Sequence, residues 1–474
     1  MLMGRGKGWG SEAGRRTVVL FVVSCALLVS LGCLGCFKHG KASGGPKLVS
    51  MLRLHGSNTI GSELAPALAE AFLQKQKASD IRRVPRAEEV EMEVEGTLPG
   101  EDSVSVIEIE AHGSGTSFTA LKEGRADIGM ASRRINDDET KTLRSLGDMT
   151  SRANEHVLGL DGVAVIVNES NPIGALDIDK IRRIFTGAIG DWKDVGGSPG
   201  AIHLYARDNN SGTFDTFKNL VLHGEEISRR AKRFQDSREL SIEVARDVSG
   251  IGFIGMPFIG SAKALKVFEG SSVPMHPTRM TVGTEDYRLS RRLYLYTAST
   301  PENPWVKKFV EFALSDEGQK VVDAIGFIGQ SLKGEQDRSP TEPISSKAQV
   351  DVPSHYYDLT KDAERLPFNV HFTSGSSKLD NKAYRDLGRL LQLMEDSHGQ
   401  SIGVVLLGFT DDVGDPQKNL DLSRQRAETV KDELIAVGIS PRVVEGFGKS
   451  KPVASNSTAE GRSRNRRVEV WLRR

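Results

Sequence analysis

The sequence predicts an α/β protein followed by a smaller α+β domain. Between residue 51 and about residue 335, short apolar segments alternate with segments of helical periodicity, which is the pattern of a sheet covered by helices. The run Val-Ala-Val-Ile-Val at 163–167 is continuously apolar, as buried parallel strands are. After residue 365 the predicted elements follow the order β-α-β-α-β-β, which is typical of an α+β layer sandwich.

Length and composition limit the possible functions. The chain has 474 residues, enough for two or three domains that each bury a core. Its 63 Lys and Arg balance 63 Asp and Glu, so no excess of positive charge indicates a nucleic-acid partner. The histidines are scattered and show no paired metal-ligand spacing. We therefore predict no enzymatic activity, no metal and no cofactor.

All three cysteines lie in the N-terminal segment 1–36, which has the features of an export signal. Basic residues occur in the first 16 positions, and 17–34 is almost unbroken apolar sequence. That run is also just long enough to span a bilayer, so a retained membrane anchor is an alternative. Cys33 and Cys36 each follow a small residue and resemble the lipobox of bacterial lipoproteins, which implies lipidation at Cys33 or Cys36 and attachment to the outer membrane. A soluble secreted form is the third alternative, and 37–50 reads as a tether.

Three short polar loops each stand between a predicted strand and a predicted helix. Their candidate ligand residues are Ser57, Asn58 and Thr59 in the first loop, Ser114, Gly115 and Thr116 in the second, and Arg207, Ser211, Gly212 and Thr213 in the third. Free backbone N–H groups at a helix N-terminus and the positive end of its dipole favour an anion. The guanidinium of Arg207 suits a tetrahedral oxyanion. One such loop alone would be an ordinary helix cap, but three predict a shared oxyanion site.

Residues 88–95 are rich in glutamate. Val90, Met92 and Val94 alternate with these acids, so the segment is most simply a half-exposed strand. A functional charged surface is the alternative interpretation.

The order of the three loops resembles that of the PstS-type phosphate-binding proteins. The similar motifs are Gly-Ser-Asn-Thr at 56–59, Gly-Ser-Gly-Thr at 113–116, Ala-Asp-Ile-Gly-Met-Ala-Ser-Arg at 126–133, Ile-Phe-Thr-Gly at 184–187 and the third loop at 207–213. The resemblance covers about residues 50–335 and implies a two-lobed periplasmic solute-binding fold at 51–335, with inorganic phosphate in the cleft. It implies a first lobe at about 51–156 and 251–335 and a second lobe at about 157–250. It also adds Ser132 and Arg133 to the predicted phosphate site.

Arg133 stands where well-known relatives have an aspartate that accepts the proton of hydrogen phosphate. Fully ionised sulfate has no such proton, so this acceptor separates the two anions. We therefore expect phosphate binding with weaker rejection of sulfate. Asp161 or Asp208 is the candidate replacement for the acceptor.

Residues 366–474 resemble the OmpA-like peptidoglycan-binding domain. The similar motifs are Gly-Phe-Thr-Asp-Asp-Val-Gly at 408–414, Asn-Leu-Asp-Leu-Ser-Arg-Gln-Arg-Ala at 419–427, Gly-Phe-Gly at 446–448 and Gly-Arg-Ser-Arg-Asn-Arg-Arg at 461–467. The resemblance implies that Asp411 and Arg426 bind the ammonium and the carboxylate of a diaminopimelate stem peptide. The residues expected to complete the peptidoglycan site are Asn419, Asn465 and Arg466. Phe409 departs from the family pattern, in which histidine is common at this position.

Prolines and polar residues in 336–365 predict a flexible linker, with no packed interface between the two domains. The whole sequence then predicts a periplasmic phosphate receptor that is anchored to peptidoglycan by its C-terminal domain. Whether an ABC transporter accepts the ligand stays open. The alternative is a structural envelope protein whose receptor domain no longer binds phosphate.

Overall fold

The computed structural model describes residues 47–88, 90–209, 211–332, 352–372, 378–396 and 402–473. The predicted export segment with Cys33 and Cys36, most of the predicted tether and residues 336–351 of the predicted linker lie outside these ranges. Within them, no helix combines the length and the apolar character needed to cross a bilayer. The last residues of the predicted tether belong to the fold, because the first strand begins at Leu48.

The first lobe contains the strands β2-β3-β4-β1-β5-β13 and half of β6, in that order across the sheet. β1 (Leu48–Gly56) pairs in parallel with β4 (Val104–Glu110) and with β5 (Ile128–Ala131). β3 (Glu91–Thr97), the strand predicted from the glutamate-rich segment, is antiparallel to β4 and to the edge strand β2 (Ser79–Pro85). The parallel strands bring the loops that follow β1 and β4 to the same edge of the sheet.

The helical stripe predicted after the first loop is confirmed. α2 (Leu64–Lys75) buries Leu64, Leu68, Phe72 and Leu73, and the ring of Phe72 lies 5.3 Å from that of Phe309 on α9 (Trp305–Leu314). The other helices of this lobe are α1 (Asn58–Gly61), α3 (Ser114–Lys122), α4 (Asp137–Thr142), α10 (Asp316–Ile325) and a 3₁₀ turn at Arg144–Leu146.

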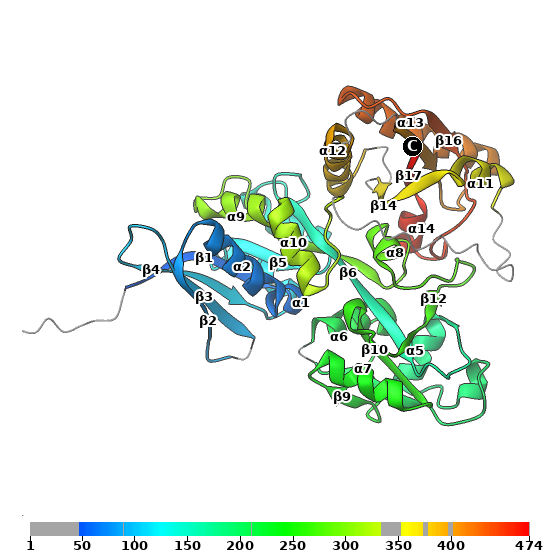
Figure 1. Ribbon diagram of the computed structural model, residues 1–474, viewed down its shortest axis with the longest axis horizontal. Helices are drawn as coiled ribbons and strands as arrows, with labels where there is room; N and C mark the ends of the chain where they lie inside the picture. Colours follow the sequence, from blue (N-terminus) through cyan, green and yellow to red (C-terminus); the bar gives the residue numbers. More distant parts are fainter. Residues whose placement is uncertain are drawn as a thin grey trace, which may run out of the picture. The chain divides into compact units, whose positions relative to one another are not determined.

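One long strand serves both lobes. β6 (Glu155–Val167) pairs through its first half with β13 (Ser290–Tyr296) in the first lobe and through its second half with β10 (Gly250–Gly255) in the second. Figure 1 shows this strand running from one lobe into the other. The predicted return to the first lobe at residue 251 is wrong, because β10 also pairs in parallel with β8 (His203–Arg207) of the second lobe. An apolar run shows that a strand is buried, but not which sheet it joins.

The second lobe is a small sheet in the order β6-β10-β8-β9 with an apolar core. In that core the rings of Phe217 and Phe253 stack 3.9 Å apart, and Phe185 contacts both. Truncating such a buried Phe to Ala typically costs about 3–5 kcal/mol. The remaining elements of this lobe and of the segment up to β13 are β7 (Ala175–Asp177), α5 (Ile178–Thr186), a 3₁₀ turn at Trp192–Val195, α6 (Gly212–Phe217) with a π-helical turn at Lys218–Leu222, β9 (Lys232–Phe234), α7 (Ser237–Arg246), a 3₁₀ turn at Met256–Phe258, β11 (Lys263–Ala264), β12 (Lys266–Phe268) and α8 (Arg279–Gly283).

The C-terminal domain is a four-stranded sheet in the order β14-β17-β15-β16. Its elements are α11 (Ser354–Thr360), β14 (Ala363–His371), α12 (Asn381–Asp396), β15 (Gly403–Gly408), α13 (Pro416–Ala436), β16 (Val443–Gly446), α14 (Ala459–Asn465) and β17 (Arg467–Arg473). The predicted order of strands and helices is confirmed, with α11 and α14 as additional short helices. α11 and the start of β14 lie within the range predicted to be linker. They belong to the C-terminal domain instead, because Tyr356 packs against Phe409, Phe447 and Trp471 of this domain.

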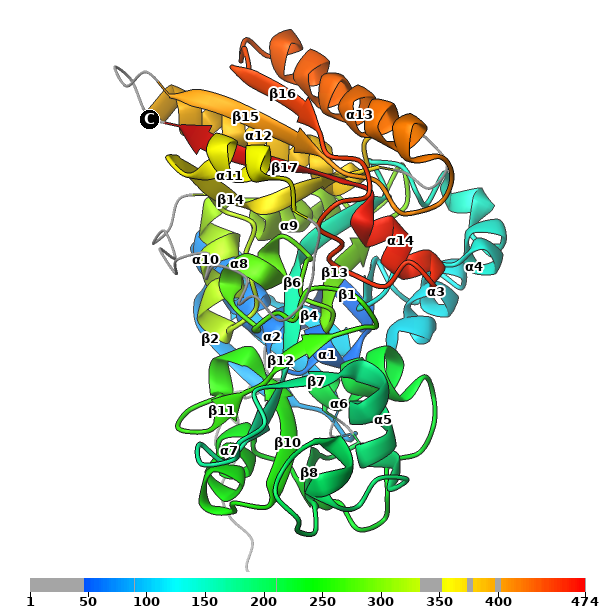
Figure 2. The ribbon, with the colours of Figure 1, turned by 90° about the vertical axis from the view of Figure 1, so that its right-hand side faces the viewer.

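Figure 2 shows α13 beside β15 and β16, and close packing at a glycine sets its position. A Cβ atom at Gly408 would lie 2.0 Å from the carbonyl oxygen of Ser423, so only glycine lets the helix approach the end of β15 this closely. The same helix carries Asn419 and Arg426. The glycine therefore helps to place two of the predicted peptidoglycan ligands.

The two domains share a packed polar interface, contrary to the prediction of independent domains. Arg292 on β13 donates to Asp380 at 2.7 Å, and Arg365 on β14 pairs with Asp286 at 2.8 Å. Arg464 on α14 donates to the backbone oxygen of Ser290 at 2.8 Å. Charged residues usually mark solvent-exposed surface, and for that reason their sequence pattern did not indicate an interface.

Candidate functional site

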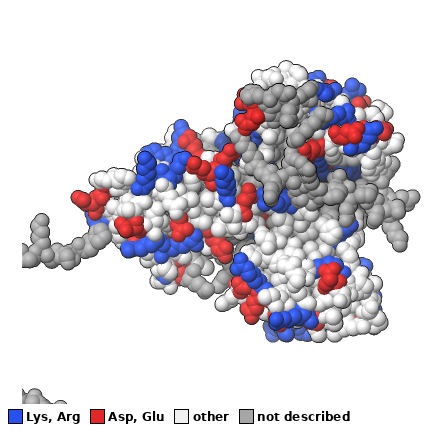
Figure 3. Space-filling model, viewed as in Figure 1, with Lys and Arg blue, Asp and Glu red and all other residues white. Residues whose placement is uncertain are grey.

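A cleft of about 870 Å³ lies beside the first and third predicted loops. Among the residues that line it are Asn58 and Thr59 of the first loop and Arg207, Ser211, Gly212 and Thr213 of the third. These loops come from different lobes, and both line the cleft. On the face drawn in Figure 3, basic and acidic side chains are interspersed over the lobes. Any selectivity for anions must therefore come from local groups.

The first loop contributes a buried hydroxyl that has no partner in the described part of the chain. The backbone N–H of Ser57 donates to the carbonyl oxygen of Met130 at 2.9 Å, which fixes the loop against β5. The side-chain oxygen of Ser57 is buried and makes no hydrogen bond to any described residue. Buried polar groups are normally satisfied, so this hydroxyl is available for a further hydrogen bond.

The first and third loops touch at Gly212. The hydroxyl of Thr59 donates to the carbonyl oxygen of Gly212 at 3.3 Å. A Cβ atom at Gly212 would lie 2.3 Å from the Cα of Thr59, so a larger residue would separate the loops. Ser211 caps α6, because its hydroxyl accepts from the N–H groups of Thr213 at 3.2 Å and Phe214 at 3.4 Å.

Arg207 lies at the cleft but is already engaged. Its guanidinium donates to the carbonyl oxygens of Phe234 at 3.3 Å and Gln235 at 2.8 Å, and also to the hydroxyl of Ser237. Asp208, named above as a candidate proton acceptor, lies 3.8 Å from the same guanidinium. These bonds tie the end of β8 to the segment that leads into α7.

The second loop is only partly brought into the site. The hydroxyls of Ser114 and Ser132 lie 3.1 Å apart, so these two predicted residues are neighbours. Gly115 and Thr116 are exposed, and the Thr116 hydroxyl donates to the carbonyl oxygen of Gly113 at 2.8 Å. Arg133 forms a bidentate pair with Glu139, with N–O distances of 2.6 Å and 2.8 Å, and its Nη2 lies beside Gly115, 3.9 Å from where a Cβ atom would stand.

Arg291 on β13 joins the first and third loops to Ser132, and the sequence interpretation missed it. Its guanidinium donates to the hydroxyl of Ser132 at 3.0 Å, to the carbonyl oxygen of Gly212 at 2.9 Å and to the hydroxyl of Thr59. A signal was present, since Arg291 and Arg292 interrupt an otherwise apolar strand. A buried charge in such a strand needs partners.

Two carboxylates balance the charge of Arg291. Asp161 on β6 lies 3.3 Å from its Nε, and Asp215 on α6 lies 3.4 Å from its Nη1. Asp161 is buried and also accepts from the hydroxyl of Thr216 at 3.1 Å. Of the two predicted candidate proton acceptors, Asp161 is therefore beside the central guanidinium, and Asp215 is a further candidate that the sequence interpretation did not name.

The C-terminal domain holds a second cluster at the end of β15. Asp411 accepts from the guanidinium of Arg466 at 2.8 Å, so the predicted partner of Arg426 is paired with a neighbour instead. Arg426 is buried, and its Nε and Nη1 have no partner among the described residues. Burial lowers the pKa of Arg426, the charge of Arg466 lowers it further, and Asp411 opposes both. The buried Nδ2 of Asn419 is likewise without a described partner.

Asn465 has a different role from the other predicted residues of this cluster. Its side-chain oxygen accepts from the N–H groups of Val453 at 2.8 Å and Ala454 at 3.1 Å. Its amide nitrogen donates to the carbonyl oxygen of Ala454 and to Asn456, both at 2.8 Å. The amide is fully hydrogen-bonded within the protein and holds the 453–456 segment against α14.

Comparison with known proteins places both halves of the chain. A PBP superfamily domain model matches residues 100–317 and an OmpA family model matches residues 371–466. The phosphate-binding protein PstS of Staphylococcus haemolyticus is 30% identical over 234 residues, which cover 48% of this chain and 72% of that protein. An ABC-type phosphate transport receptor from Vibrio cholerae is 23% identical with a TM-score of 0.46, covering 58% of this chain and 99% of that one. The peptidoglycan-associated lipoprotein of Burkholderia pseudomallei is 25% identical with a TM-score of 0.21, covering 22% of this chain and 89% of that one.

Proposed function

This chain belongs to the PstS family of phosphate-binding proteins and carries a C-terminal OmpA family domain, and on that premise we propose that it is a phosphate receptor held to the cell wall. Inorganic phosphate binds between the lobes, and peptidoglycan binds the C-terminal domain. The proposal of phosphate binding rests on one observation, which is that Thr59, Ser132 and Gly212 all accept hydrogen bonds from Arg291. The matched relatives are binding proteins, so we assign no enzymatic activity.

Phosphate suits the groups around Arg291. The hydroxyls of Ser57, Thr59 and Ser132 and the guanidinium can all donate to phosphate oxygens, and bonds to a charged acceptor are the stronger kind. The carboxylates of Asp161 and Asp215 can accept the proton of hydrogen phosphate. Sulfate lacks that proton, so the same carboxylates would disfavour it. We accordingly propose that selectivity rests on Asp161 and Asp215, since Arg133 replaces the aspartate of well-known relatives.

Ser57 gives the cleanest test of this site because its hydroxyl has no described partner to lose. We expect Ser57→Ala in the full chain to weaken phosphate binding about tenfold or more, which corresponds to roughly 1.5 kcal/mol for a hydrogen bond to a charged group. Isothermal titration calorimetry measures this directly. Ser170→Ala, at an exposed position outside the cleft lining, is the control and should bind as the wild type does. Equal affinities of Ser57→Ala and wild type would move the site elsewhere.

The second half of the proposal rests on the unpartnered donors of Arg426. A diaminopimelate residue carries an ammonium and a carboxylate, and the carboxylate can take the free Nε and Nη1 of Arg426. Asp411 would take the ammonium. We expect the full chain to sediment with purified peptidoglycan and Asp411→Ala to remain in solution. Binding by Asp411→Ala that high salt abolishes would instead indicate nonspecific attraction to basic residues.

We further propose a periplasmic location with a lipid anchor at Cys33 or Cys36. Its support is the pattern of residues 1–36 together with the two envelope-type domains. Labelled palmitate should enter the wild type and not the Cys33→Ala, Cys36→Ala double variant. Wild type that stays unlabelled and retains its N-terminal segment by mass spectrometry would indicate a membrane helix.

One observation favours the alternative of a purely structural role. Arg291 already has two carboxylates beside it, so its charge is balanced without an anion. If this pairing has replaced the ligand, phosphate should give no heat in the titration while peptidoglycan binding persists. A saturable phosphate titration excludes this alternative.

A further inference from the structure

An acidic face on the first lobe is not explained by the proposed function. The antiparallel pairing of β3 and β4 places Glu91 opposite Glu110 and Glu93 opposite Glu108. Like charges directly opposite each other destabilise a strand pair. Arg86 lies 3.3 Å from Glu93 and 3.4 Å from Glu110. His55 lies 3.2 Å from Glu110, and Arg53, which also pairs with Asp127, is the strand neighbour of Glu108. Two guanidiniums, one of them shared with Asp127, therefore face four carboxylates, and the face retains a negative charge.

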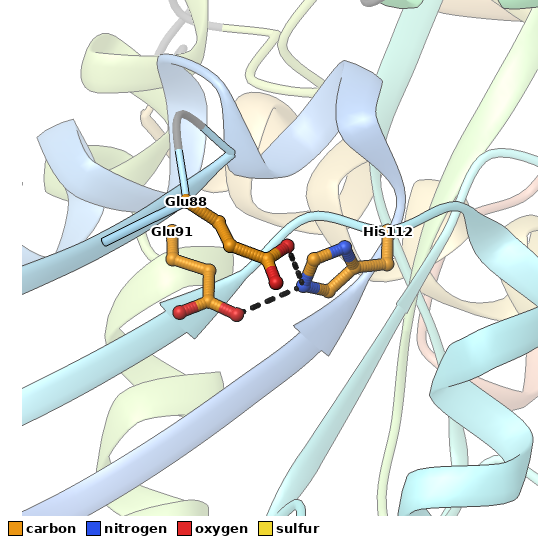
Figure 4. A group of neighbouring side chains, drawn as sticks. All are labelled: Glu88, Glu91 and His112. Carbon is orange, nitrogen blue, oxygen red and sulfur yellow. Dashed lines mark hydrogen bonds and ion pairs between the residues drawn. The ribbon is translucent and has the colours of Figure 1, made fainter. Parts of the chain in front are cut away.

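Three side chains at one end of this face converge on a single point (Figure 4). The Nε2 atom of His112 lies 3.1 Å from a carboxylate oxygen of Glu91 and 3.9 Å from one of Glu88. Each residue offers one ligand atom, and these atoms all lie within 4.8 Å of one another. In the described part of the chain, this is the one group of His, Cys, Asp or Glu with such spacing.

Backbone hydrogen bonds hold the three residues in place. The N–H of Glu91 donates to the carbonyl oxygen of Glu88 at 2.9 Å and closes the turn between β2 and β3. The N–H of Ala111 donates to the carbonyl oxygen of Val90 at 3.0 Å, which fixes the residue before His112 against that turn. The cluster therefore depends on main-chain geometry as well as on attraction between its side chains.

We propose that Glu88, Glu91 and His112 bind a divalent transition-metal ion of the zinc type. Zinc–ligand bonds of about 2.1 Å in a tetrahedron place ligand atoms roughly 3.4 Å apart, and the observed 3.1 Å and 3.9 Å lie on either side of that value. One imidazole and two carboxylates suit zinc, whereas calcium and magnesium prefer oxygen ligands alone. The side chains of Glu88 and His112 are 66% and 33% exposed, so an ion has access from solvent.

The position of the site connects it to the cleft. Glu91 lines the cleft, and His112 directly precedes the second loop with Ser114. Carboxylates at the entrance of an anion site repel the anion, and a bound dication offsets this repulsion. The effect of the metal ion on phosphate binding rests on the proposed function, whereas the metal site itself does not.

Direct metal binding tests the site. The full chain, without an affinity tag and after dialysis against chelator, is titrated with Zn²⁺ in competition with a chromogenic zinc indicator. We expect one equivalent bound per chain, and we expect His112→Ala and Glu91→Gln each to weaken binding at least tenfold. His203→Ala is the matched control, because His203 is also an exposed histidine beside a carboxylate, at 2.7 Å from Asp247. Unchanged melting temperatures confirm that the variants are folded.

Absence of saturable zinc binding, or equal binding by His112→Ala and wild type, would overturn the site. A second measurement separates this result from the fate of the phosphate proposal. At low ionic strength, saturating Zn²⁺ should raise the association rate of phosphate several-fold in the wild type and leave it unchanged in His112→Ala. If the chain binds zinc but not phosphate, the metal site stands and the phosphate proposal fails.

Discussion

The two predicted ligand sites each contain a buried arginine, and the surroundings of these arginines differ. Arg291 beside the cleft is bonded to Thr59, Ser132 and Gly212 and faces Asp161 and Asp215. Arg426 in the C-terminal domain keeps two donor nitrogens without a described partner. In the cleft, an incoming anion must compete with bonds that already exist. In the C-terminal domain, a carboxylate would satisfy groups that are otherwise buried at a cost.

This difference predicts opposite effects on stability. We expect Arg291→Met to lower the free energy of unfolding by about 3–5 kcal/mol, because it leaves the buried carboxylate of Asp161 without its partner. Thermal and denaturant unfolding of the full chain without phosphate measure the loss. Arg182→Met is the control, since Arg182 makes only surface pairs with Asp179 and Glu225 and should change the value by about 0.5 kcal/mol or less. Wild-type stability in Arg291→Met would mean that Arg291, like Arg426, makes no net contribution to the free energy of unfolding.

Arg426→Met should separate binding from stability. The variant removes a buried charge that lacks partners, so its melting temperature should equal or exceed that of the wild type. Peptidoglycan binding should weaken by about 2–5 kcal/mol, because the ligand carboxylate loses its counter-charge. Sedimentation with purified peptidoglycan measures the affinity. Arg424→Met, at an exposed position of the same helix, should retain binding.

The interface between the domains gives a smaller expected effect. Asp380→Asn removes the charge that pairs with Arg292 at 2.7 Å and should lower the free energy of unfolding by about 1–3 kcal/mol. Differential scanning calorimetry should show one transition in the wild type and two in the variant, as the domains become independent. Asp432→Asn, at an exposed position, should leave the wild-type profile unchanged. Two transitions in the wild type would argue that the interface does not couple the domains.

The same interface makes stability depend on pH. Burial lowers the pKa of His371, and this effect outweighs the opposing charge of Glu285. Burial also acts to raise the pKa of the Glu285 and Asp380 carboxyls, but Arg292 outweighs it and both pKa values are lowered. A lowered pKa means that the folded state binds fewer protons, so stability is full above the unfolded pKa and is lost as pH falls towards the folded pKa.

The expected decrease therefore has two stages. The first begins below the ordinary histidine value of 6.5 and the second below the ordinary carboxyl values of 4.5 and 3.8. Melting temperatures of the full chain from about pH 7.5 to pH 4 follow both stages. His371→Asn should reduce the first stage, and the rest comes from other histidines, above all His156, whose pKa burial lowers to about 4. His203→Asn, at an exposed position, should leave the first stage unchanged. A first stage of wild-type size in His371→Asn would assign it to His156 or another group.

Local sequence signals identified much of the candidate sites. Ser57, Thr59, Ser211 and Gly212 lie at strand-to-helix junctions, and such junctions are visible in one chain as a change of periodicity beside small polar residues. Arg133 shows the limit of this reasoning. It stands at the expected place in its motif, yet its guanidinium is engaged by the carboxylate of Glu139. A motif fixes the position of a residue along the backbone, whereas neighbours elsewhere in the chain decide its rotamer.

The sequence by itself determined the two domains, the order of their strands and helices and the loops that form the cleft, because each depends on residues that are close along the chain. The tertiary structure decided that Arg291 bonds to Thr59, Ser132 and Gly212, that β10 belongs to the second lobe and that Asp380 pairs with Arg292. Each of these contacts joins residues from different parts of the chain. Hydrophobic periodicity reports which residues are buried but not what they meet, so only the folded arrangement could supply the partners.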